Sequence, residues 1–103
     1  MATIISSQHH LDDEIVEAKR VDRDYEVMLS PAFEIDGLTV QVVLDGHHSL
    51  AAAKADGVDA DYIVANATDH DAVTLIDSDP RLFLEAVWAD GDYYDVINGG
   101  DVW

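Results

Sequence analysis

The sequence predicts an α/β (α+β) fold in a single domain, residues 1–103, with a small mixed β-sheet flanked by three or four helices. Asp36-Gly37 joins two runs of alternating apolar residues, a pattern typical of a β-hairpin. The run from Val42 to Gly57 contains three apolar residues, an Asp-Gly turn and an Ala-rich stretch, which predicts a strand-turn-helix motif. Helical spacing of apolar residues in two further segments indicates the flanking helices.

The first elements predicted along the chain are a strand and an amphipathic helix. Thr3-Ile4-Ile5 has the β-branched composition of a short strand. Residues 11–20 carry Leu11, Ile15 and Val16 at helical spacing. Acidic residues fill the first turn of this segment and basic residues its last turn, the order that the helix dipole favours. We therefore expect one helix over residues 11–20.

A hairpin is predicted next. Residues 25–29 and 33–35 are extended and rich in apolar residues, and residues 38–44 continue the alternation after the Asp36-Gly37 turn. Pro31 has no backbone N–H to donate, so the first arm is expected to be an edge strand or to break there.

The middle of the chain is predicted to form a compact βαβ-like unit. Its parts are a strand over 38–44, a helix over 48–56 and a strand over 62–66. If the two strands are parallel, the crossover between them is expected to be right-handed. Packing of the helix on the sheet predicts one core cluster that contains Leu44, Leu50, Ile63 and Phe83.

Two helices are predicted after this unit. Thr68 and Asp71 have the spacing of a capping box for a short helix near 69–76. Asp79-Pro80 supplies a cap and a first helical residue for a helix over 80–90. The inward face of this second helix is expected to consist of Leu82, Phe83, Ala86 and Val87.

Acidic residues dominate the charge of the chain, and the net charge is −17 at pH 7. Direct binding to DNA or RNA is not expected, because affinity for the phosphate backbone comes from Lys and Arg. A positively charged partner is the natural complement, since opposite fields steer association. The same composition would suit a halophilic protein, and the sequence leaves both explanations open.

Other features of the composition bear on compartment and chemistry. The chain has no Cys, which excludes a disulfide framework, a thiolate metal site and a cysteine nucleophile. No stretch approaches the ~20 apolar residues of a membrane span, and the N-terminus lacks the layout of a signal peptide. We expect a cytoplasmic protein that does not contact a membrane.

The run VVLDGHHSLAAAKADG carries the most specific pattern, in which Asp45, Gly46, His48 and Gly57 bracket three consecutive alanines. The run resembles the signature of the ParB/sulfiredoxin-like superfamily, a strand followed by Asp-Gly-x-His-Arg and an Ala-rich helix that ends at Gly. The resemblance covers residues 38–66. It implies a nucleotide-binding or phosphate-hydrolysing enzyme whose site would consist of Asp45, Gly46, His47, His48 and Ser49.

Ser49 stands where the superfamily places an Arg that grips phosphate. One hydroxyl does not replace a guanidinium fork that binds phosphate bidentately. The resemblance implies that His48 helps to hold a nucleotide phosphate. The alternative is that His48 and Ser49 only cap the helix and pack on Asp45.

Histidines and carboxylates supply ligand types for a metal ion, but not the spacing of a known zinc motif. We therefore expect no metal site and no other cofactor. No pair of carboxylates stands out among so many, and no Ser/His/Asp signature is present, so no catalytic residue is predicted. The residues considered as metal ligands are Asp45, His47, His48 and His70, with His9 and His10 in addition.

Aromatic residues near the end of the sequence are further candidates, because Trp and Tyr are enriched at interfaces. Trp88 is expected in the core. Tyr93, Tyr94 and Trp103 either close the core or anchor a partner.

By size and charge the chain also resembles small acidic phage proteins that inhibit CRISPR and restriction complexes. The preferred function is therefore a non-catalytic inhibitor, encoded by a phage or mobile element. As a DNA mimic it would block a basic nucleic-acid-binding site on a partner protein or complex. The alternatives are the enzyme described above and an acidic halophilic housekeeping domain. The partner, host and oligomeric state stay open. The residues predicted to bind the partner are Asp69, Asp71, Asp77, Asp79, Asp90, Asp92, Tyr93, Tyr94 and Asp95.

Overall fold

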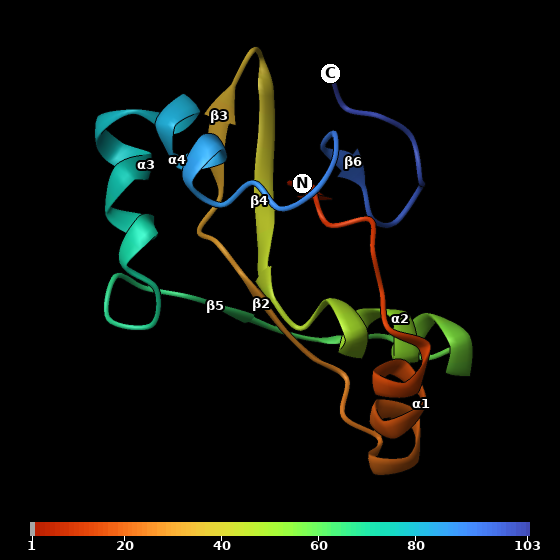
Figure 1. The fold of residues 1–103 in the computed structure, drawn as a ribbon. Helices are drawn as coiled ribbons and strands as arrows, with labels where there is room; N and C mark the ends of the chain where they lie inside the picture. Colours follow the sequence, from red (N-terminus) through yellow and green to blue (C-terminus); the bar gives the residue numbers. More distant parts are fainter. Residues whose placement is uncertain (1) are drawn as a thin grey trace.

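A computed structural model describes residues 2–103, which form a mixed α/β fold with a six-stranded mixed sheet and four helices (Figure 1). The strands are β1 (Thr3–Ser6), β2 (Glu26–Leu29), β3 (Phe33–Ile35), β4 (Leu38–Asp45), β5 (Asp61–Val64) and β6 (Tyr94–Asp95). The helices are α1 (Asp13–Asp22), α2 (His47–Asp56), α3 (Leu75–Ser78) and α4 (Pro80–Ala86), with a 3-10 turn, η1 (Asp71–Thr74), before α3. The predicted mixed sheet flanked by helices is therefore confirmed.

β4 lies at the centre of the sheet, whose strand order is β5-β2-β4-β1-β6. β1 pairs in parallel with one edge of β4, and β2 and β3 both pair antiparallel with its other edge. Ser30 separates β2 from β3, and its N–H and Oγ both bond to the backbone of Val42. Pro31 follows directly, so the predicted break at this proline is confirmed.

The unit that contains β4, α2 and β5 differs from the prediction. β5 pairs in parallel with β2, and β2 is antiparallel to β4. β4 and β5 therefore run in opposite directions with β2 between them, so no parallel crossover links them. The reason is that β2 already occupies the edge of β4, which leaves only the outer edge of β2 for β5.

The tight turn between β3 and β4 is the one that the sequence predicts. Asp36 and Gly37 both have positive φ angles, 52° and 80°, as a type I′ turn requires. Ile35 faces Leu38 directly across this turn. The hairpin register therefore follows from the Asp-Gly dipeptide and the alternation around it.

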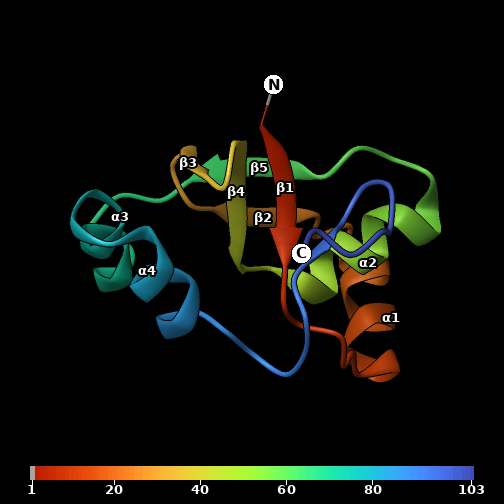
Figure 2. The same cartoon turned by 90° about the horizontal axis from the view of Figure 1, so that it is seen from above.

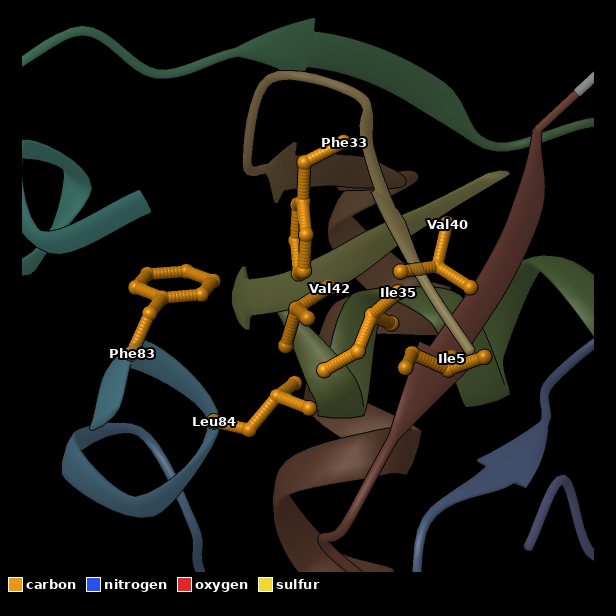
Figure 3. Close-up of a cluster of buried hydrophobic side chains, with 7 residues drawn as sticks. All are labelled: Ile5, Phe33, Ile35, Val40, Val42, Phe83 and Leu84. Atoms are coloured by element: carbon orange, nitrogen blue, oxygen red, sulfur yellow. The ribbon is translucent and has the colours of Figure 1, made fainter. Parts of the chain in front are cut away.

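The core consists of two clusters on the two faces of the sheet, because successive side chains of β4 point in opposite directions. Figure 2 shows α3 and α4 beside one face and α1 and α2 beside the other. Figure 3 shows the cluster on the α4 side, which contains Ile5, Phe33, Ile35, Val40, Val42, Phe83 and Leu84. The cluster on the α2 side contains Val27, Leu29, Val43, Leu50 and Val96.

The prediction of a single core cluster was therefore wrong. Leu50 and Phe83 belong to different clusters, and Leu44 is only partly buried against the cluster that contains Phe83. Ile63 is 40% exposed. The reason is its place in β5, an edge strand whose four residues are all exposed.

Helix α1 begins slightly later than predicted, at Asp13. Asp12 is its N-cap, and the Asp12 carboxylate accepts the N–H groups of Glu14 and Ile15. The helix lies against α2. It buries none of its residues fully, so its amphipathic pattern produces only partial burial.

Helix α4 begins at Pro80 with Asp79 as N-cap, as predicted, but it ends at Ala86 rather than near residue 90. The cause lies at the other end of the chain, where Ser7 accepts the N–H groups of residues 89–91. Those bonds replace helical ones. The predicted inward face was also partly wrong, because Leu84 is buried whereas Leu82 and Ala86 are exposed.

The short helix predicted near 69–76 is present as η1 followed by α3, but its cap differs from the prediction. Asn66 Oδ1 accepts the N–H groups of Thr68 and Asp69 at 2.9 and 3.0 Å. In return, Asp69 Oδ2 accepts the Asn66 N–H at 3.1 Å. These bonds stabilise the turn before η1. The N-cap of η1 is His70, which makes no side-chain cap bond, so the capping box predicted at Thr68 and Asp71 is absent.

Candidate functional site

The strand-turn-helix motif places Gly46 at the N-terminus of α2, directly after β4. Gly46 has a φ of 92°, and no side chain in the described part of the chain caps the helix here. A Cβ at this position would lie 2.5 Å from the carbonyl oxygen of Glu26 and 2.9 Å from the Cα of Val27. The glycine therefore allows the start of α2 to approach the backbone of β2.

His47 points back toward β1. Its Nε2 lies 2.8 Å from Oγ of Ser6, a buried residue, and the two atoms share a hydrogen bond. Burial lowers the pKa of His47, although the Asp45 carboxylate opposes this effect. Burial therefore favours the neutral imidazole, which does not attract a phosphate by charge.

His48 connects α2 to α1. Its Nε2 accepts the backbone N–H of Asp12 at 3.1 Å, so the proton of the neutral ring lies on Nδ1. One ring nitrogen of His48 therefore already has a partner inside the molecule. The alternative, in which His48 and Ser49 cap α2, differs from the structure, because no side chain among the described residues caps this helix and His48 bonds to the N-cap residue of α1 instead.

Ser49 is 2% exposed, and its Oγ faces the Asp24 carboxylate at 3.5 Å. The other oxygen of Asp24 lies 2.8 Å from Lys19 Nζ. This hydrogen bond lowers the pKa of Asp24 and raises the pKa of Lys19. Lys19 thus brings a cation near the position of the missing Arg, but its charge is paired with Asp24.

A polar cavity of about 230 Å³ lies beside His47, where β1 and β4 end. Ser6, Ser7, Asp45 and His70 contribute to its lining. Nδ1 of His70 is buried and has no hydrogen-bond partner among the described residues. Within residues 2–103, no group of three or more His, Asp or Glu side chains is arranged to hold a metal ion.

Sequence reasoning missed Ser6, Ser7 and Lys19, which complete the surroundings of the motif. These residues come from β1, the segment after it and α1, and they reach the motif only through the tertiary fold. The one local sign was the pair of serines at the end of the first strand, which could have indicated Ser6 and Ser7 but not Lys19.

The predicted partner-binding aspartates fall into two groups in the fold (Figure 1). The first group lies around the two short helices: Asp69 precedes η1, Asp71 begins it, Asp77 lies in α3 and Asp79 is the N-cap of α4. The other three lie in the segment after α4 and in β6, and the Asp90 carboxylate accepts the N–H groups of His9 and His10. These bonds lower the pKa of Asp90. The second group consists of Asp90, Asp92 and Asp95.

The aromatic candidates separate in the structure. Tyr94 donates its OH to Gln8 O, and its ring centroid lies 4.8 Å from that of His9. Tyr93 is half-buried against the α4-side core. Trp88 is 56% exposed, so its predicted place in the core was wrong. The early end of α4 is the cause, because Trp88 follows the helix instead of lying on its inner face.

Comparison with known proteins finds no family model, no curated protein and no solved structure that matches this chain. The resemblance to the ParB/sulfiredoxin-like superfamily therefore rests on residues 38–66 and stays a hypothesis. No helix in residues 2–103 combines the length and apolar character needed to cross a membrane.

The side chains of the motif already have hydrogen-bond partners within the protein, which leads to a prediction about nucleotides. We expect no micromolar binding of CTP, ATP or GTP, because His48 is bonded to α1 and Lys19 to Asp24, and Asp45 repels phosphate. Titration calorimetry with each nucleotide and Mg²⁺ measures this. A micromolar isotherm that His48→Ala abolishes in a folded variant would contradict the prediction and support the enzyme.

Proposed function

We propose that this protein is a non-catalytic acidic inhibitor that occupies a basic nucleic-acid-binding surface on a partner protein or complex. It would act as a DNA mimic of the anti-CRISPR or anti-restriction kind, encoded by a phage or other mobile element and active in the cytoplasm. The observation that carries the proposal is the distribution of uncompensated carboxylates in the C-terminal half.

Among the described residues, the acids neutralised by ion pairs all lie at or before Asp56. Arg20 pairs with Glu17 and Asp56, Lys19 pairs with Asp24, and Arg81 reaches back to Asp36. Within the described residues, no carboxylate after Asp56 pairs with a base. This half therefore presents a negative field that opposite charges on a partner would complement.

Several of these carboxylates are also held in fixed positions. The Asp79 carboxylate accepts two N–H groups at the start of α4, and the Asp95 carboxylate accepts those of Ile97 and Asn98. Asp69 and Asp90 are held in the same way by other backbone N–H groups. Charges with fixed positions lose less conformational freedom on binding than flexible ones. This supports a rigid mimic of a phosphate array.

We expect the protein to compete with DNA for a guide-RNA-loaded CRISPR effector or a restriction endonuclease. Asp71, Asp77 and Asp92 are suitable for the test, because their carboxylates make no hydrogen bond within the described structure. Replacing all three with Asn should weaken competition about tenfold, at roughly 0.5 kcal/mol for each exposed charge pair. Fluorescence anisotropy of labelled DNA bound to the effector measures the loss.

A matched control removes three charges from α1 through Asp13→Asn, Glu14→Gln and Asp22→Asn, and it should compete almost as well as the unmodified protein. Competition should also weaken steeply with added salt, because the Debye length is only ~8 Å at physiological ionic strength. Equal losses for both triple variants would contradict the placement of the surface. A chain that folds only in molar salt would assign its acidity to halophilic adaptation instead.

A further inference from the structure

Three aromatic side chains form an open groove beside α4. Trp88, Tyr93 and Trp103 line it together with Leu84, Arg81 and Glu85. We call this the aromatic groove; its volume is about 430 Å³. Trp88 is 56% exposed and Trp103 is 48% exposed. Two large indoles exposed together on a small domain are typical of an interaction site.

Hydrogen bonds fix the rings of the aromatic groove before any ligand binds. Trp88 Nε1 donates to Gly91 O at 2.8 Å, and the Tyr93 OH donates to Leu84 O at 2.6 Å. Trp103 packs edge-on against Tyr93, with ring centroids 6.0 Å apart and an interplanar angle of 84°. The Val102 N–H donates to Tyr93 O at 3.1 Å and holds the segment that carries Trp103. A ligand therefore meets a preorganised surface.

The charges around the aromatic groove favour a cation. The guanidinium of Arg81, one of the lining residues, is paired with Asp36, which compensates its positive charge. The carboxylate of Glu85, another lining residue, has no ion pair in the described structure, and the whole chain carries a net charge of −17. The faces of indole rings also attract cations through the ring quadrupole. The ring faces and the negative charge therefore both favour a cationic ligand.

We propose that the aromatic groove receives an arginine side chain of the basic partner, with the guanidinium stacked on an indole and bonded to Glu85. Arginine fits better than lysine, because a planar guanidinium stacks on a ring and can also form a fork with a carboxylate. This inference rests on the proposed function, in that it names the anchoring residue of the same partner. The residues that line the aromatic groove include none of the aspartates predicted to bind the partner.

The test uses short capped peptides at constant ionic strength and ¹H–¹⁵N NMR of the protein. Acetyl-Gly-Arg-Gly-amide is the probe, and the matching Lys and Ala peptides are compared with it. Both Trp residues of the chain line the aromatic groove, so both indole N–H signals report on it directly. We expect both signals to shift with the Arg peptide. The Ala peptide should leave them in place, and the Lys peptide should bind more weakly by about threefold.

Variants separate the aromatic groove from general attraction to an acidic protein. Trp88→Ala, Trp103→Ala and Glu85→Gln should each weaken binding of the Arg peptide by about fivefold. Glu34→Gln is the control. Phe33 and Ile35 on β3 point into the core on the α4 side, whereas Glu34 between them is exposed and points to the opposite face of the sheet. This control should bind as the unmodified protein does. The dispersion of the remaining amide signals checks the fold of each variant.

Three results from the peptides and the Trp variants would overturn the inference. One is equal binding of the Arg and Lys peptides, and another is unchanged binding by the Trp variants. The third is a concentration-dependent dimer that either Trp variant abolishes, because a second copy would then occupy the groove. Binding of the Arg peptide without competition against DNA would retain the aromatic groove and remove the DNA-mimic proposal. Competition that depends on Asp71, Asp77 and Asp92 but not on Trp88 would retain the DNA-mimic proposal and remove the aromatic groove as its anchor.

Discussion

Replacing Phe83 with Ala is expected to lower the free energy of unfolding by about 3–5 kcal/mol, the range for truncation of a buried Phe. Phe83 is fully buried on α4, where it meets Phe33 edge-on with ring centroids 5.5 Å apart. Its removal would leave a cavity between α4 and the β3–β4 hairpin (Figure 3). Denaturation with urea, followed by circular dichroism, measures the loss.

The preceding residue supplies the matched control. Leu82 is 44% exposed although the helical pattern predicts it on the inward face, so Leu82→Ala should cost less than about 1 kcal/mol. Similar losses for the two variants would show that α4 packs with a different face from the one in this structure.

Replacing Gly46 with Ala is expected to cost about 2–4 kcal/mol, because two penalties combine at this position. The residue has a φ of 92°, where an L side chain is strained by about 1–2 kcal/mol. The new Cβ would also lie 2.5 Å from the Glu26 carbonyl oxygen, a backbone atom that cannot rotate away. Relief of this clash requires α2 to separate from β2, which disturbs the packing between them.

Gly57 isolates the first penalty, because it also has a positive φ, 69°, and ends the same helix. A Cβ at Gly57 would meet nothing within 4 Å. Gly57→Ala should therefore cost only about 1–2 kcal/mol. The difference between the two glycine variants measures the close approach of α2 to β2. Equal costs in thermal unfolding would argue against that approach.

Local patterns predicted much of the fold, because the forces that form single elements act over a few residues. The Asp36-Gly37 turn fixes its hairpin through two positive φ angles, and Asp79-Pro80 starts α4 through a cap and a fixed φ. The arrangement of strands was less predictable. Whether β5 pairs with β4 or with β2 depends on which edge is free, and β2 lies far from β5 in the sequence.

The side-chain contacts of the candidate site were even less predictable from local patterns than the arrangement of strands. Asp45 to Ser49 were predicted together, and the structure does place them at one strand-helix junction. What each side chain does depends on partners from other segments, such as Ser6 for His47 and Asp12 for His48. The end of α4, and with it the exposure of Trp88, depends in the same way on Ser7. No local pattern contains these distant contacts.

The position of β1 inside the sheet has a consequence for how the molecule forms. β1 lies between β4 and β6, so Ile5 is paired with Val42 on one side and Asp95 on the other. Pairings so distant along the chain require large loops to close before any contact is gained, which slows folding. During synthesis, β1 must wait until Asp95 has left the ribosome before its second neighbour exists. Until β4 pairs with one edge of β1, and later β6 with the other, each edge stays open to incorrect strand partners.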